Sequence, residues 1–203
     1  MLLENLKQFD WMNEPFNVRF DERGMHVAAK YRTDFWCCAR YDFRKDDGHF
    51  FYTYVLGDFC CDLNWEFSSA QNFDQCGIML RTDVNNWFKA SIMYENDENP
   101  LLATSLTVDG YSDLATHPLP SGVKRVWYRL KRRKGCFVVS YSLNGKDYTQ
   151  LRKFFLIHDF DDVKVGAYLC SPQREGFAAV LRDISISGDN LLLPPSFYAY
   201  FRV

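Results

Sequence analysis

A two-residue alternation is the sequence feature that most limits how this chain can fold. Every second residue from Phe59 to Phe67 is apolar, whereas the residues between them, from Asp58 to Glu66, are mostly polar. In an extended chain this pattern places the apolar side chains on one face. Turn signals such as Asn144-Gly145 recur about every ten residues along the sequence. We therefore predict many short antiparallel strands, of which several have one buried face.

The strands predicted most clearly cover residues 50–67, 75–82, 87–95, 102–108, 126–132, 137–143, 148–155, 163–170 and 177–187. Aromatic residues make up 17% of the chain, which suits pleated sheets, and no segment has the periodicity of an amphipathic helix. With 203 residues and no low-complexity linker, one hydrophobic core is expected. The prediction is an all-β domain over residues 1–187, with about twelve strands stacked as an antiparallel two-sheet β-sandwich.

Residues 188–203 have a different composition. They contain three consecutive leucines, two prolines and four aromatic residues. Such an apolar segment is a poor candidate for free disorder. Two interpretations remain open, namely a tail that packs on the domain and a segment that docks a partner.

Charge and cysteine content exclude several classes of function. The 24 basic residues nearly balance the 26 acidic ones, so we expect neither a nucleic-acid nor a membrane partner. Seven cysteines form no Cys-x-x-Cys motif and lie at no zinc-ligand spacing from histidine, which predicts free thiols and no metal or other cofactor. The Asp-rich segment 159–162 lacks the ligand pattern of an EF-hand and is interpreted as a turn rather than a calcium site. The N-terminus resembles no signal peptide, so a cytoplasmic location is expected.

Eight short motifs connect the chain to a known family. In order they are Trp11-Met12-Asn13-Glu14-Pro15, Thr33-Asp34-Phe35-Trp36, Asp47-Gly48-His49-Phe50, Gly57-Asp58-Phe59, Asp74-Gln75-Cys76-Gly77-Ile78-Met79-Leu80-Arg81, Asn86-Trp87-Phe88-Lys89-Ala90, Ser112-Asp113 and Tyr141-Ser142-Leu143-Asn144-Gly145. Together they resemble the regulation-of-enolase protein family, a domain of unknown function, over about residues 11–186. The resemblance implies a concanavalin A-like lectin/glucanase sandwich (jelly roll). The family name implies a regulatory connection to enolase, and other members of the fold often bind or cleave glycans.

The chain departs from the family pattern at three positions. Arg40 replaces the usual His, Met93 replaces a Glu, and Leu114 replaces a Trp. If the family site binds sugar, these three replacements change side chains that would contact the sugar.

Two sets of polar residues are candidate sites. Asp58, Asp62 and Glu66 share one strand face, but residues four apart on a strand are separated by about 13 Å. Glycosidases need two carboxyl groups within about 5 to 9.5 Å of each other, so a solvated face is the favoured interpretation.

Other catalytic motifs are absent from the sequence. No Gly-x-Ser-x-Gly elbow or phosphate loop occurs, and the basic run 131–134 is interpreted as a solubilising edge.

The second set supplies both aromatic faces and polar groups, the combination that binds sugars. The predicted ligand-binding residues are Asp34, Trp36, His49, Gln75, Arg81, Trp87 and Lys89. The alternative is that the tryptophans fill core and that Arg81 pairs with Asp74 or Glu95. The favoured function is a non-catalytic binding module for carbohydrate or a sugar-derived metabolite. A module that contacts a metabolic enzyme and a divergent glycoside hydrolase remain as alternatives.

Overall fold

The computed structural model describes residues 6–68, 72–95, 100–157, 162–173 and 176–192. Within these residues the chain forms sixteen strands, two short 3-10 helices and no α-helix. The 3-10 helices are η1 (Leu6–Gln8) and η2 (Ala39–Tyr41). The strands are β1 (Asp10–Met12), β2 (Val18–Asp21), β3 (Gly24–Ala28), β4 (Phe35–Cys38), β5 (Phe43–Asp46), β6 (His49–Phe67), β7 (Gln75–Arg81), β8 (Trp87–Tyr94), β9 (Pro100–Val108), β10 (Tyr111–Ser112), β11 (Ala115–Pro118), β12 (Arg125–Arg133), β13 (Cys136–Ser142), β14 (Thr149–Phe155), β15 (Asp162–Cys170) and β16 (Ala178–Leu192).

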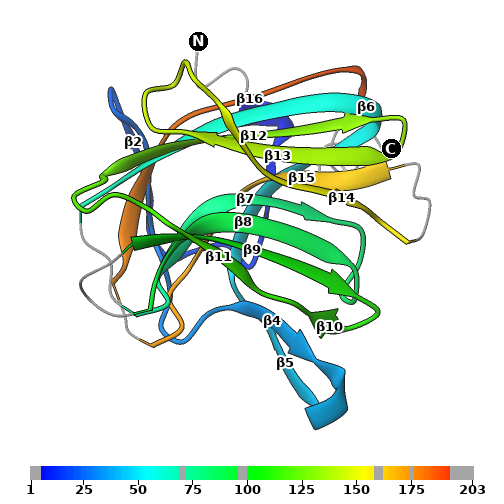
Figure 1. The fold of residues 1–203 in the computed structure, drawn as a ribbon. Coiled ribbons are helices and arrows are strands. Elements are labelled where there is room, and N and C mark those ends of the chain that lie inside the picture. Colours follow the sequence, from blue (N-terminus) through cyan, green and yellow to red (C-terminus); the bar gives the residue numbers. More distant parts are fainter. Residues whose placement is uncertain (1–5, 69–71, 96–99, 158–161, 174–175, 193–203) are drawn as a thin grey trace, which may run out of the picture.

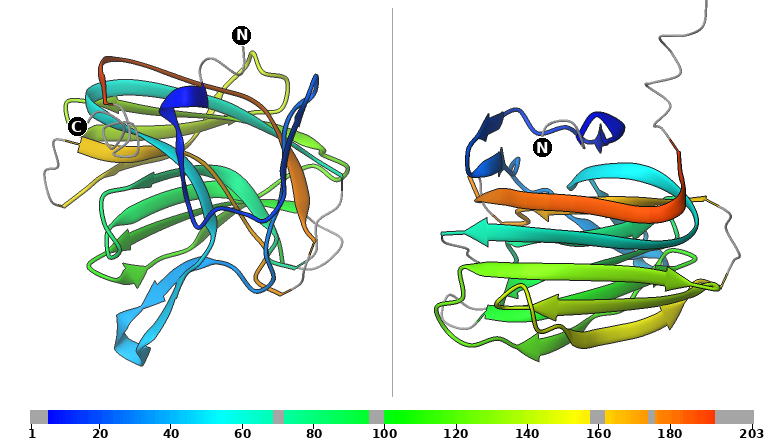
Figure 2. Two further views of the ribbon diagram at one scale, coloured as in Figure 1. Left: turned by 180° about the vertical axis from the view of Figure 1, so that it is seen from behind. Right: turned by 90° about the horizontal axis from the view of Figure 1, so that it is seen from above.

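The strands form two stacked layers that share the long strand β6 (Figures 1 and 2). The upper sheet contains β14, β13, β12, the second half of β6, β16, β3 and β2. The lower sheet contains the first half of β6, then β15, β7, β8 and β9, with β10 and β11 paired to β9. All these pairs are antiparallel, and the predicted two-sheet sandwich is therefore confirmed.

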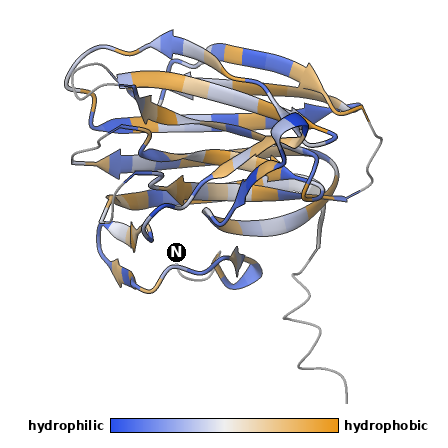
Figure 3. Cartoon of the chain, turned by 90° about the horizontal axis from the view of Figure 1, so that it is seen from below, coloured by the Kyte–Doolittle hydropathy of each residue, from blue (hydrophilic) through white to orange (hydrophobic). Residues whose placement is uncertain are grey.

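The core lies between the sheets and follows the predicted alternation of β6. Phe59, Cys61, Leu63, Trp65 and Phe67 are each at most 2% exposed. The alternation of apolar and polar residues is visible along many strands (Figure 3). The indole Nε1 of Trp65 donates a hydrogen bond to the carbonyl oxygen of Gly77 in the opposite sheet, at 2.9 Å. This bond satisfies the only polar atom of the large buried side chain.

Sixteen strands are present where about twelve were expected. The additional ones are short, such as β1, β4, β5, β10 and β11, which hold two to four residues each. A segment of this length shows no recognisable alternation.

The end of the described chain continues the upper sheet. Strand β16 runs through Leu192, which lies opposite Tyr54 of β6. The remaining residues of the predicted tail, 193–203, lie outside the described residues.

All seven cysteines are free, and burial raises the pKa of the Cys61, Cys76 and Cys170 thiols well above the ordinary value. In the described part of the chain, no helix has the length and hydrophobicity needed to cross a bilayer.

Candidate functional site

The outer face of the lower sheet gathers four of the predicted residues. Gln75 and Arg81 lie on β7, and Trp87 and Lys89 lie on β8. Residues an even number of positions apart share one face of a strand, and Arg81 lies directly opposite Trp87. The four side chains therefore start from the same face, directed away from the core.

The hairpin formed by β4 and β5 covers part of this face, and its tip projects away from the sandwich (Figure 1). At its base the Phe35 side chain is fully buried, with ring centroids 6.5 Å from Trp87 and 6.3 Å from Tyr168. Trp87 lies beneath this contact and is only 1% exposed. Trp87 is consequently a packing residue in this arrangement and offers no open ring surface.

Two ion pairs attach the hairpin to the sheet. The Nζ of Lys89 lies 3.1 Å from Oδ1 of Asp34 and donates to the carbonyl oxygen of Phe35 at 2.6 Å. The guanidinium of Arg81 makes a two-pronged contact with the carboxylate of Asp46, with the second nitrogen at 2.8 Å. Arg81 therefore pairs with Asp46 rather than with Asp74 or Glu95, the two partners considered from the sequence.

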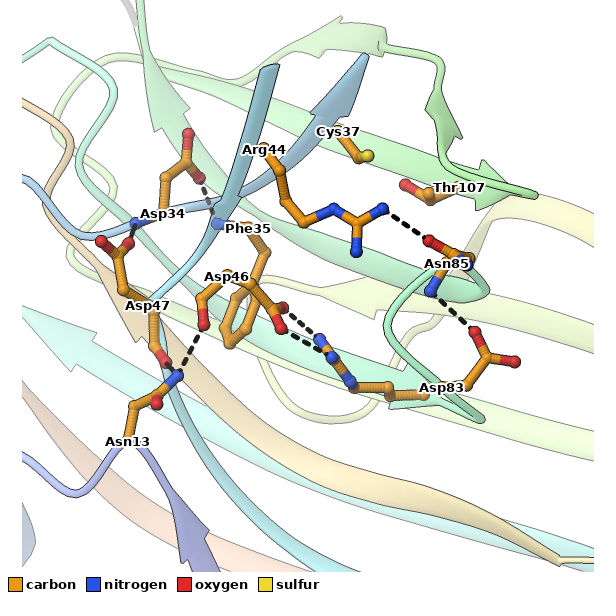
Figure 4. Close-up of polar contacts among 12 residues, drawn as sticks. Asn13, Asp34, Phe35, Cys37, Arg44, Asp46, Asp47, Asp83, Asn85 and Thr107 are labelled. Carbon is orange, nitrogen blue, oxygen red and sulfur yellow. Dashed lines mark hydrogen bonds and ion pairs between the residues drawn. The ribbon is translucent and has the colours of Figure 1, made fainter. Parts of the chain in front are cut away.

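A network of backbone contacts fixes the position of Asp34 (Figure 4). Its N–H donates to Oδ1 of Asp47 at 2.8 Å, and its carbonyl oxygen accepts from the N–H groups of Asp47 and Gly48. The side-chain amide of Asn13 donates to the carbonyl oxygens of Asp46 and Gly48, both at 2.9 Å. Asp34 is therefore held where its carboxylate reaches Lys89.

His49 supports the same loop and is itself fully buried. Its Nδ1–H donates to the carbonyl oxygen of Asn13, and its Nε2 accepts from the Lys30 N–H at 2.9 Å. Both ring nitrogens are thus used by the neutral form of the ring. Burial lowers the pKa of His49 below its ordinary value of 6.5.

Acidification is therefore expected to weaken the fold through His49. The contribution of this residue to stability is complete above about pH 6.5. It is lost as the pH falls through the lowered pKa, because the unfolded chain binds the proton more readily. In urea unfolding at pH 7.5 and 5.5, wild type should lose more free energy of unfolding than His49→Gln, which cannot titrate. Equal losses in the two proteins would exclude this role.

A cavity of about 220 Å³ lies beside the hairpin on the same sheet face. It is lined by Asp34, Trp36, Phe73, Gln75, Lys89, Ser91, Met93, Ala103, Thr104, Ser105 and Leu114. Four of the seven predicted site residues line it, together with two of the three positions that differ from the family pattern, Met93 and Leu114.

Several polar atoms in this cavity have unused hydrogen-bonding capacity. The hydroxyl of Ser105 is buried, with the residue 1% exposed, and has no partner among the described residues. Oδ1 of Asp34 accepts from Lys89 and from the Phe35 N–H at 2.7 Å, whereas Oδ2 has no hydrogen bond to a described residue. Gln75 accepts from the Tyr168 hydroxyl at 3.1 Å and donates to the Phe73 carbonyl at 3.2 Å, which leaves one amide hydrogen free.

Three predicted site residues, His49, Arg81 and Trp87, do not line the cavity. Ser91 and Ser105 also line the cavity and were not among the predicted site residues. A detectable signal existed for both, because they are polar residues in the mostly apolar strands β8 and β9, and they share the outward face with Lys89. Arg40, the third family difference, lies in η2 at the hairpin tip and does not line the cavity.

The carboxylates Asp58, Asp62 and Glu66 lie outside the cavity, on the upper sheet. Asp62 pairs with Arg129 at 2.6 Å, and Glu66 pairs with Arg23 and Arg182. Among the described residues that line the cavity, Asp34 is the only carboxylate. No group of three metal-ligating side chains occurs in the described part of the chain, and segment 159–162 lies mostly outside it.

Comparisons with known proteins agree with this architecture. A family model described as "Protein of unknown function (DUF1349)" matches residues 11–188. The Saccharomyces cerevisiae protein named "Regulation of enolase protein 1" is 29% identical over 183 residues, covering 90% of each chain. These matches confirm the family resemblance found in the sequence motifs.

Solved structures show the same fold. A functionally unknown protein from Saccharomyces cerevisiae has a TM-score of 0.83 at 28% identity, covering 92% of this chain and 99% of that chain. The carbohydrate-binding module CBM66 from Bacillus subtilis has a TM-score of 0.56 at 13% identity, covering 88% of this chain and 95% of that one. The GH43 protein BlXynB from Bacillus licheniformis has a TM-score of 0.66 at 13% identity, covering 90% of this chain but 38% of that protein. At 13% identity, the similarity to CBM66 and to BlXynB shows a shared fold and nothing about activity.

Proposed function

Because the chain belongs to the DUF1349 family, a family described as of unknown function, we propose a function from the chemistry of its own cavity. The proposal is a non-catalytic module that binds a carbohydrate or a sugar-derived metabolite in the cavity beside Asp34. The observation that carries it is the Ser105 hydroxyl, which is buried against the cavity and has no hydrogen-bond partner in the described part of the chain. A buried hydroxyl without a partner is unfavourable by about 1–3 kcal/mol, and a hydroxylated ligand would remove this cost.

The balance of charge in the cavity favours a neutral polyol. The positive charge of Lys89 is already matched by Asp34 and the Phe35 carbonyl, so the cavity holds no unpaired cation among the described lining residues. The free acceptor at Asp34, the hydroxyl of Ser105 and the free amide hydrogen of Gln75 provide both acceptors and donors. Sugar hydroxyls can use both kinds of group at once.

The cavity walls provide apolar contact as well. Trp36 is half-buried and lines the cavity, together with Met93 and Leu114. Such side chains pack against the C–H surface of a sugar ring. The volume of about 220 Å³ is far more than one water molecule needs and leaves room for a sugar-sized group.

A thermal-shift screen of the whole chain against mono- and oligosaccharides tests this proposal. A sugar present at about twenty times its Kd should stabilise the protein by about 1.8 kcal/mol, or about 4 to 7 °C in Tm. Ser105→Ala should remove most of the shift. Because its hydroxyl has no partner, this substitution should leave the free energy of unfolding without ligand unchanged or raise it by up to about 1 kcal/mol.

Ser140→Ala is the matched control, since Ser140 is a half-buried serine of β13 in the upper sheet. It should keep the full ligand-induced shift. The proposal fails if no saccharide raises the Tm of wild type, or if Ser105→Ala and wild type respond equally.

A second candidate function is a regulatory contact with a metabolic enzyme. The name of the yeast relative, "Regulation of enolase protein 1", supports it. Glycoside hydrolysis is not proposed, because it requires two carboxyl groups and the described lining of the cavity supplies one.

A further inference from the structure

A groove on the outer face of the upper sheet is separate from the cavity. With a volume of about 990 Å³, it lies where β12, β6, β16, β3 and β2 run side by side (Figure 2). One row of directly opposed residues crosses all five strands, in the order Arg125, Glu66, Val180, His26 and Arg19. The row therefore has a guanidinium at each end.

The floor of the groove between these ends carries three small aliphatic side chains, those of Ala28, Ala178 and Val180. They lie beside Glu66 and His26 of the row, and Nε2 of His26 lies 2.8 Å from Oδ2 of Asp21. Phe16 is the one exposed aromatic side chain among the described lining residues, and the Nζ of Lys30 lies 3.9 Å from the centre of its ring. Sugars are bound mainly by flat aromatic surfaces, whereas a floor of small aliphatic side chains suits the side chains of a peptide.

The rim of the groove carries an excess of positive charge. Arg19, Arg23, Lys124 and Arg125 line it, whereas Glu66 is the only carboxylate among the described lining residues. Glu66 is already contacted by Arg23 and, at 3.6 Å, by Arg182. The local charge is therefore opposite in sign to the net charge of −2 of the whole chain.

Two of these cations have unused donors. Arg19 is an exposed residue of β2, and no hydrogen bond to a described residue uses its guanidinium, although the Asp21 carboxylate two residues along lies within electrostatic reach. Arg125 donates through Nε to Asn64 at 2.9 Å and lies 4.4 Å from the centre of the Trp127 ring, which leaves its two terminal amino groups free. Unpaired guanidinium groups recognise carboxylates through two parallel hydrogen bonds.

The spacing of these cations sets the size of the occupant. Arg19 and Arg125 are four strand steps apart, which is about 19 Å at roughly 4.8 Å per step. An extended peptide of about six residues covers this distance at roughly 3.3 Å per residue. We propose that the groove docks an extended, acidic polypeptide segment of a partner protein. This proposal deepens the second candidate function and is independent of sugar binding.

Fluorescence anisotropy with a labelled octapeptide of alternating Glu and Val tests the proposal, using the whole chain at low and moderate salt. The Glu-Val peptide should bind, and its affinity should fall as the salt concentration rises. A control Gln-Val octapeptide, in which Gln replaces every Glu and so removes the negative charges, should bind at least about tenfold more weakly. The double variant Arg19→Gln/Arg125→Gln should weaken binding of the Glu-Val peptide about tenfold, while circular dichroism shows an unchanged fold.

Lys131→Gln is the matched control, because Lys131 is an exposed residue on the same strand and face as Arg125, about 20 Å along β12. It should bind the acidic peptide like wild type. Absence of peptide binding, equal affinity for the Gln-Val peptide, or equal weakening by Lys131→Gln would overturn the proposal. Tighter binding of an acidic oligosaccharide such as tetragalacturonate would also overturn it. A saccharide shift that persists in the double variant would show that the cavity functions even if the groove proposal fails.

Discussion

Phe35→Ala is expected to lower the free energy of unfolding by about 3–5 kcal/mol, the usual cost of removing a large buried ring. The Phe35 ring is fully buried between Trp87 and Tyr168, and the guanidinium carbon of Arg81 lies 5.8 Å from its centre. Its removal would leave a cavity and loosen the base of the β4–β5 hairpin. Because Asp34 precedes Phe35 in the chain, the saccharide-induced thermal shift should also be lost. Urea unfolding and the thermal-shift screen measure the two effects.

Phe43→Ala provides the control on the same hairpin. Phe43 is 49% exposed, so its replacement should change the free energy of unfolding by about 0.5 kcal/mol or less. If Phe35→Ala and Phe43→Ala were equally mild, the hairpin would not be anchored by Phe35, and the position of Asp34 beside the cavity would not depend on that ring.

Lys89→Met is expected to lower the free energy of unfolding by about 2–4 kcal/mol. Lys89 is 5% exposed and lies between the Asp34 carboxylate and the Phe35 carbonyl. Methionine preserves much of the side-chain volume but leaves Asp34, whose side chain is 20% exposed, without its counter-ion. Removing one partner of a buried ion pair lowers the free energy of unfolding more than replacing both partners does, because the remaining charge is left uncompensated.

A double-mutant cycle separates the charge effect from packing. Asp34→Asn in the Lys89→Met background should recover part of the lost stability, because the uncompensated charge is then removed. Lys153→Met, at an exposed position of β14, should have little effect. If Lys89→Met were also neutral in urea unfolding, or if the cycle showed no coupling, the proposed pairing would be excluded.

Much of the fold could be predicted because the long strands carry their own pattern. The alternation from Phe59 to Phe67 identified the buried face of β6, and the Asn144-Gly145 turn identified the antiparallel pair of β13 and β14. The short strands were missed for the opposite reason. Strands such as β4 and β5 exist because the hairpin packs on the sheet, and this tertiary contact leaves no periodicity in four residues.

The candidate site was predictable only where strand geometry determines it. The alternation of β7 and β8 brings Gln75 and Lys89 to one face, and both line the cavity. Trp87 lies on the same face, but its burial depends on Phe35, which comes from a hairpin about 50 residues earlier in the chain. The pairing of Arg81 with Asp46 depends on the same hairpin. Neither contact can be inferred from local sequence, because both depend on where the hairpin folds over the sheet.

A crystal structure of the protein with the saccharide that gives the largest thermal shift tests the central claim most directly. The account predicts one sugar ring in the cavity, with hydroxyl oxygens within about 2.7–3.2 Å of the Ser105 hydroxyl and Oδ2 of Asp34. A sugar bound only elsewhere on the molecule, with the cavity beside Asp34 filled by water alone, would contradict the account.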